Sequence, residues 1–193
     1  MQSSDYLRTD TLEDALSSLE LAVEFYDRGK SDERYWKWFV IAMHSGVQGC
    51  FSLALAGSHS LLVQKSGVAA KMLAAIEARS EIPAPHMDNF LRLYAKLQSE
   101  SNLRSSEVLP LPKSIDQKSG LESLDELRDE FLHFNTKSWS CEYALIESAA
   151  RTAVEVARFL LFESRAILIY DYDVSRRAEH AVASLSHRLK IDA

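Results

Sequence analysis

The sequence predicts an all-α protein. Apolar residues recur at spacings of three and four over most of the chain, which is the period of an amphipathic helix. Alternation with a period of two is almost absent, and we expect the one β-like run, 167–170, to finish a helix. The 193 residues, of which 47% are hydrophobic, suffice for one core. We therefore expect a helical bundle over 1–170 and a C-terminal helical extension over 171–193.

The first helix is expected over 12–28. Thr11 can cap its N-terminus, with Asp14 as the capping-box partner, and Gly29 supplies the stop. One face carries apolar residues at helical spacing, namely Leu12, Ala15, Leu16, Leu19, Ala22, Val23 and Tyr26.

The second helix is expected to begin at Ser31 and to continue to about Leu61. Its apolar residues exceed one face, which predicts burial by neighbouring helices or by a second subunit. Gly46 and Gly49 are small enough to let another helix approach closely. The most apolar window, 38–57, is interrupted by polar residues, which favours a core helix over a membrane span. Because the N-terminus lacks a signal-peptide pattern, we expect a cytoplasmic protein without a membrane partner.

Two shorter helices are expected over 68–78 and 86–98, separated by Pro83 and Pro85. Residues 99–120 carry further prolines and several serines and show no sustained period. They predict a long loop, and a loop of this length inside a compact domain is usually functional or mobile.

A helix over 123–134 follows, with Ser123 and Glu126 as its capping box. A long helix is expected over 140–168, and a weaker, peripheral one over 175–189. The simplest packing is a four-helix arrangement of the first, second, 123–134 and 140–168 helices.

Composition narrows the range of functions. The formal net charge of −6 argues against a broad nucleic-acid surface, which would be basic, but leaves room for a small cationic pocket. Cys50 and Cys141 are expected to be buried thiols in a reducing compartment. No Cys and His spacing is typical of a zinc site, and we expect neither a metal nor a cofactor.

The segment from Arg128 to His133 is the main candidate for chemistry. Asp129 and His133 are four residues apart, so on a helix they share a face, and the carboxylate could orient the imidazole. A histidine can move protons near neutral pH, and an arginine can hold a phosphate through two contacts. Together they could cleave a phosphodiester without metal, His133 relaying the proton of a ribose 2′-hydroxyl and Arg128 stabilising the phosphate oxygens.

This segment, Arg128-Asp129-x3-His133, resembles the R-x4-6-H motif of the HEPN superfamily. The resemblance implies an all-α, HEPN-like four-helix bundle that forms a homodimer and acts as a metal-independent endoribonuclease. It also implies that Arg128 and His133 are catalytic, with Asp129 as a supporting polar residue where the family more often has Asn. The partners expected on this basis are RNA or a nucleotide, and an antitoxin or nucleotidyltransferase of a toxin–antitoxin or defence system.

Other interpretations of the segment remain open. It can be an ordinary charged helix end, since His133 is favourable near a helix C-terminus. The protein can be a non-catalytic HEPN-like module that binds a nucleotide or a protein, or a helical scaffold. Arg79 and His86 also match the spacing, but that pair spans two prolines and lacks the helical setting.

Two further groups of residues have two interpretations each. His44 and Gln48 share one face of the second helix, either as a satisfied core pair or as a polar wall of the site. The tryptophans Trp36, Trp38 and Trp139 are expected to be core or interface residues, and stacking on a nucleic-acid base is the weaker alternative.

Overall fold

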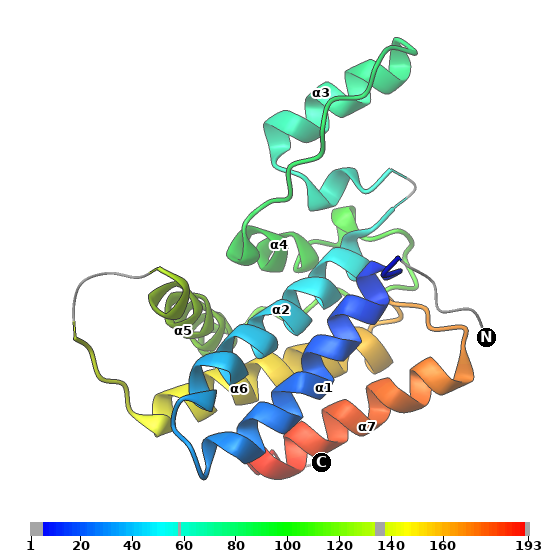
Figure 1. Cartoon of the computed structure of the whole chain (residues 1–193). Coiled ribbons are helices and arrows are strands. Elements are labelled where there is room, and N and C mark those ends of the chain that lie inside the picture. The colour runs from blue at the N-terminus through cyan, green and yellow to red at the C-terminus, as the bar shows by residue number, and fades with distance from the viewer. Residues whose placement is uncertain (1–5, 58, 134–137, 192–193) are drawn as a thin grey trace.

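The computed structural model describes residues 6–57, 59–133 and 138–191, and it is entirely helical (Figure 1). Within these residues no β-strand is formed beyond one isolated bridge between Gln64 and Met87, so the all-α prediction is confirmed. The α-helices are α1 Thr11–Gly29, α2 Tyr35–Leu55, α3 Ser66–Glu77, α4 Phe90–Leu97, α5 Ile115–Leu132, α6 Tyr143–Arg158 and α7 Tyr172–Leu189. The shorter turns are η1 Leu61–Val63, η2 Glu100–Asn102 and the π-helical η3 Phe159–Glu163.

Helix α2 lies at the centre of the bundle and packs against α1, α4, α5 and α6. Helix α7 packs against both α1 and α6, so α1, α2, α6 and α7 close a four-helix ring (Figure 1). The expected ring contained the helix now labelled α5 in place of α7. In the structure α5 instead covers one side of the α2–α6 pair.

Helix α7 is part of the core and is not peripheral. Its cap is Asp171, whose carboxylate accepts from the backbone of Asp173 and Val174. Arg177 reaches across to α1 and pairs with Glu13 and Glu20 at 2.8 Å. These ion pairs join residues far apart in the chain, so the spacing of apolar residues within the helix could not indicate them. For this reason the helix was expected to be weak. Its buried residues belong to the same core as the other helices: Ala178, Ala181, Val182, Leu185 and Leu189.

The ends of α1 and α2 differ from expectation for local reasons. Asp10 caps α1 in place of Thr11, because its Oδ1 accepts from two backbone N–H groups at 2.9 Å. Helix α2 begins later than Ser31, since the Asp32 carboxylate accepts from the backbone N–H of Arg34 and holds this segment in a turn. It also ends before Leu61, which lies in η1.

Helix α5 begins eight residues earlier than the expected start at Ser123. Ser114 caps it by accepting from the backbone N–H of Gln117. The expected loop over 99–120 is therefore shorter. It is also anchored, because Val108 and Leu111 are buried and the Leu111 N–H donates to the carbonyl of Leu97 at 2.9 Å. The first turn of α5, 115–118, is largely exposed and mostly polar, so the spacing of apolar residues did not indicate where the helix begins.

The expected long helix over 140–168 is divided. Helix α6 begins at Tyr143, passes at Phe159 into the π-helical η3, and the chain leaves helical structure after Glu163. Residues 167–170 do not finish a helix but form irregular structure in which Ile167 is buried.

The surplus of apolar residues on α2 is covered within one chain. Its interior includes Phe39, Met43 and Phe51, all fully buried by the surrounding helices. The pattern therefore does not itself require a second subunit, and the homodimer remains a prediction. Among the described residues α2 is the one helix that is long and apolar enough to cross a membrane. However, 67% of its apolar 18-residue stretch is buried inside the bundle, as expected of a core helix.

Helix α3 and the segment returning from it extend away from the bundle (Figure 1). The base of this arm is held by the buried carboxylate of Asp88, which pairs with Lys96 of α4 at 2.8 Å. The same ammonium donates to the carbonyls of Leu62 and Gln64 at 2.8 Å. This arrangement ties η1 and the returning segment to α4.

The close approach of α1 to α2 generates the first prediction. A methyl group at Gly49 would lie 2.6 Å from Cβ of Ala15, so Gly49→Ala should destabilise the protein by about 1–3 kcal/mol through overpacking. Gly67 on α3 has no neighbour within 4 Å, and Gly67→Ala should leave stability unchanged or raise it by up to about 1 kcal/mol.

Urea unfolding measures both variants. In the double variant Gly49→Ala with Ala15→Gly, the loss should be smaller than the sum of the single losses, because the two methyl groups no longer overlap. Additive losses would contradict the proposed close contact.

Candidate functional site

Arg128 lies on α5 where this helix packs against α2. Its Nη2 is 2.7 Å from Oδ1 of Asp125, and its Nη1 is 2.7 Å from Oδ1 of Asp129. Both partners belong to the same helix, at i−3 and i+1. The guanidinium is thus held between two carboxylates, and its side chain is 25% exposed.

His44 of α2 also contacts these side chains. Its Nε2 is 2.9 Å from Oδ1 of Asp125 and 3.2 Å from Nη2 of Arg128. The imidazole is 3% exposed and stacks on Phe90 of α4, with the ring centroids 4.2 Å apart. The two interpretations of His44 therefore combine: its ring is part of the core, and its polar edge lines the group. We call His44, Asp125, Arg128 and Asp129 the Arg128 cluster.

The charges of the cluster follow from burial and pairing. Burial lowers the pKa of His44, against the hydrogen bond with Asp125, so the imidazole is neutral at pH 7. Burial alone would raise the pKa of Asp125, but the hydrogen bond from His44 and the charge of Arg128 outweigh it and lower that pKa. A proton on Nε2 of His44 then donates to an ionised Asp125.

An incoming anion can contact the guanidinium of Arg128 from one side. Its Nε is buried and has no hydrogen-bond partner among the described residues, and Asp125 is 22% exposed and shared with His44. Asp129 is 51% exposed, so it is the partner that an incoming phosphate can replace at the least cost. Of the two carboxylate partners of Arg128, Asp129 is thus the more exposed to solvent.

His133 lies at the end of α5, outside the helix. The helix ends at Leu132, and His133 has an extended backbone with φ −89° and ψ 106°. Its N–H donates to the carbonyl of Asp129, and its side chain is exposed. The expected i,i+4 pairing of Asp129 and His133 thus falls at the last position of the helical hydrogen-bond ladder, and it stays a prediction. Among the described residues no hydrogen bond or ion pair joins the imidazole to Arg128 or Asp129.

Gln48 lies apart from the Arg128 cluster. Its amide nitrogen is 4.0 Å from the sulfur of Met87, and it lines a shallow cavity with Asp14 of α1. The structure therefore brings together Arg128, Asp129 and His44 but not Gln48. Asp125 was missed, although its i,i+3 spacing from Arg128 was visible in the sequence.

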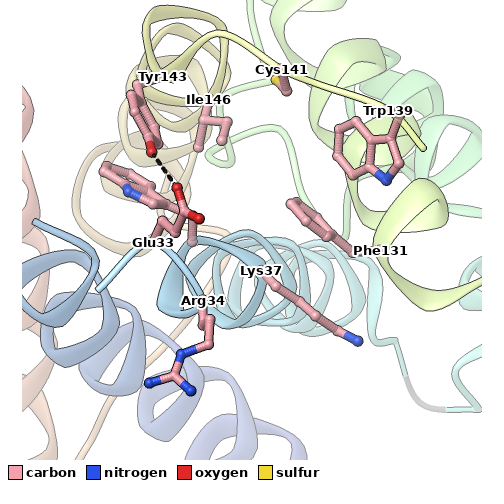
Figure 2. A pocket seen from close by; sticks show the side chains of 9 residues that line it. Glu33, Arg34, Lys37, Phe131, Trp139, Cys141, Tyr143 and Ile146 are labelled. Atoms are coloured by element: carbon pink, nitrogen blue, oxygen red, sulfur yellow. Dashed lines mark hydrogen bonds between the residues drawn. The ribbon is translucent and has the colours of Figure 1, made fainter. Parts of the chain in front are cut away.

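A cleft also lies beside the end of α5, where it meets the start of α2 and of α6 (Figure 2). It has a volume of about 450 Å³ and is lined by aromatic rings from all three elements, including Phe131 and Tyr143. Of the three tryptophans, Trp36 is buried as expected. Trp38 and Trp139 are half exposed, and only Trp139 and Trp36 line the cleft. No sequence period indicated this convergence, because each ring comes from a different segment.

The described residues contain no group of three or more His, Cys, Asp or Glu side chains arranged to hold a metal ion. Cys50 is fully buried, which raises the pKa of its thiol to about 12. Cys141 is partly exposed at the cleft, so the expectation of two buried thiols is right for Cys50 alone.

Comparison with known proteins identifies no relative: no protein-family model, no curated protein and no solved structure matches the chain. The resemblance to the HEPN superfamily consequently depends on the motif around Arg128 and on the order of the helices.

The buried imidazole predicts a pH dependence of stability. The unfolded chain protonates His44 near its ordinary pKa of about 6.5, whereas burial lowers the pKa in the folded chain. Between the two values the unfolded state binds more protons. The free energy of unfolding should therefore fall as the pH drops below about 6.5, by at most about 1.4 kcal/mol per pH unit.

Urea unfolding between about pH 7.5 and pH 5 measures this slope. His44→Gln keeps a donor toward Asp125 but cannot titrate, so its slope should be shallower. His59→Gln, which removes an exposed imidazole, is the matched control and should keep the wild-type slope. Equal slopes in all three proteins would exclude His44 as the source.

Proposed function

We propose that this chain is a metal-independent endoribonuclease of HEPN type that acts as a homodimer, with Arg128 and His133 as its catalytic residues. One observation carries the proposal. Arg128, the first residue of the motif, is held at the α2–α5 contact by Asp125, which also accepts from the buried His44. Among the described residues the other terminal nitrogen of Arg128 pairs with the exposed carboxylate of Asp129. This arrangement orients a guanidinium toward an incoming anion.

The proposed reaction divides the work between two side chains. His133 accepts the proton of a ribose 2′-hydroxyl, whose oxygen attacks the adjacent phosphorus and forms a cyclic phosphate. The bond to the 5′-oxygen breaks, and a second imidazole, the partner subunit's His133, gives that oxygen a proton. Arg128 replaces its contact to Asp129 by the phosphate and stabilises the developing charge. The exposed position of His133 is compatible with both proton transfers.

A second candidate is a non-catalytic module that binds a nucleotide or a protein. The specific observation in its favour is that both terminal nitrogens of Arg128 are already paired with carboxylates, a state that a structural network would also produce. Under this alternative an antitoxin or a nucleotidyltransferase would be the partner, and the cluster would fix α5 on α2.

The ribonuclease proposal predicts that Arg128→Ala and His133→Ala each reduce RNA cleavage about a hundredfold or more, because neither residue can replace the other. Asp129→Asn should be milder, since the amide keeps a hydrogen-bonding group and removes a competing charge. Cleavage should persist in EDTA, because the proton transfers and the phosphate contact are both made by side chains. The assay is cleavage of mixed RNA by purified protein, with circular dichroism to verify folding.

Arg79→Ala and His86→Ala provide a matched control, because this pair has motif-like spacing but lies exposed on the arm. Both should cleave like wild type. If all variants cleave equally, the activity is a contaminant. If no preparation cleaves RNA, the binding module becomes the better explanation.

The proposed dimer predicts a species of twice the 21.8 kDa chain mass in sedimentation velocity at micromolar concentration. Two-fold pairing is the commonest oligomeric arrangement and would bring two copies of the motif together. A single boundary at the chain mass over this range would contradict the shared site, and with it the role of the second imidazole.

A further inference from the structure

The cleft beside the end of α5 has the size and lining of a small-ligand site. Its volume of about 450 Å³ falls in the range of cavities that hold small molecules. Four aromatic rings line it, from the start of α2, the end of α5 and the start of α6 with the residues before it. These rings belong to Trp36, Phe131, Trp139 and Tyr143.

The rings are arranged as two walls. Figure 2 shows Trp139 and Phe131 on one side of the cleft and Tyr143 on the other. Phe131 and Trp139 meet edge to face, with centroids 4.9 Å apart, while Trp36 packs against Tyr143 at 5.3 Å. Trp139 is 39% and Tyr143 50% exposed, so both keep surface for a further flat ring. Exposed aromatic surface of this kind is what stacking on a nucleobase uses.

Polar groups occupy the edge of the same cleft. Glu33 lies beside Tyr143, whose hydroxyl donates to its carboxylate at 3.4 Å. A carboxylate at the edge of an aromatic slot accepts from a base amino group, but cannot accept from a carbonyl oxygen. Arg34 and Lys37 lie at the rim (Figure 2). Arg34 is paired with Asp32 at 2.6 Å, so a phosphate would share its guanidinium with this carboxylate, beside the ammonium of Lys37.

The cleft adjoins the motif along one helix. Phe131 follows Arg128 by three residues and precedes His133 by two, so the cleft and the Arg128 cluster are about one helical turn apart on α5. A nucleotide chain bound at Arg128 could therefore place a neighbouring base in the cleft.

We propose that this cleft is a base-binding subsite for a ribonucleotide, in which Trp139 stacks on the base, Glu33 accepts from its amino group, and Arg34 and Lys37 face its phosphate. As a subsite for the RNA substrate it rests on the proposed ribonuclease function. The chemistry of Glu33 sets a preference for adenine, cytosine or guanine over uracil, because the one N–H donor of uracil lies between two carbonyl oxygens that repel a carboxylate.

The test is titration calorimetry of the full chain with adenosine monophosphate and with uridine monophosphate. Adenosine monophosphate should bind saturably and more tightly than uridine monophosphate. Trp139→Ala should weaken its binding about tenfold, and Trp139→Phe should restore part of the loss. Tyr170→Ala, which removes an exposed aromatic ring outside the cleft, is the control and should bind as wild type.

Two further arms test the polar groups. Glu33→Gln should reduce the preference for adenosine monophosphate over uridine monophosphate. Adenosine without a phosphate should bind more weakly than its monophosphate, and Lys37→Ala should remove that difference. Circular dichroism identifies a variant that fails to fold. If Trp139→Ala does so, Trp139→Phe and Glu33→Gln decide.

The subsite is overturned if adenosine monophosphate shows no saturable binding up to about 10 mM. Binding that Trp139→Ala and Tyr170→Ala leave equally intact would overturn it too. The two proposals can fail separately. Trp139-dependent binding in a protein that cleaves no RNA would keep the base site and reject the ribonuclease. Cleavage with a KM unaffected by Trp139→Ala would keep the ribonuclease and reject the subsite.

Discussion

The burial of α2 is the constraint on which the rest of the structure depends. Phe39, Met43 and Cys50 share one side of this helix and Phe51 lies about 120° around it, and none of them can be left in water without a large loss of hydrophobic free energy. Helices α1, α4, α5 and α6 surround it in consequence, and α7 completes the ring through α1 and α6. The small residues Gly46 and Gly49 set how closely α1 can lie, and so fix the spacing of the ring.

The same constraint creates the candidate site. His44 is a polar residue on the central helix, and a buried imidazole needs a partner. Asp125 of α5 provides one, and Arg128 then balances the charge of Asp125. The buried His44 is thus connected through Asp125 to Arg128, whose guanidinium also pairs with the exposed carboxylate of Asp129. A plain ion-pair network and an anion site share this geometry, and what separates them is whether an anion can displace Asp129.

The residues of both functional proposals lie at or beside the end of α5. The helix ends at Leu132, and the side chain of His133, which follows, is exposed. Phe131, at the same end, lines the aromatic cleft. Arg128, His133 and the cleft therefore lie within about two turns of one helix. An acidic chain with a formal charge of −6 would need such a local arrangement, rather than a broad basic surface, to bind a polyanion.

The sequence by itself determined the all-α class, the stripe of α1, the existence of α2 and α4, the approximate extent of α3 and the close approach at Gly46 and Gly49, because each depends on residues only a few positions apart. It also singled out Arg128, Asp129 and His44. The start of α5 and the core position of α7 escaped it, since a polar first turn and the ion pairs of Arg177 give no apolar period. Only the tertiary structure decided that Asp125 joins His44 to Arg128, that Asp129 pairs with Arg128, and that four rings converge in a cleft. Those relations bring together residues far apart in the chain, or depend on where a helix ends, and packing fixes both.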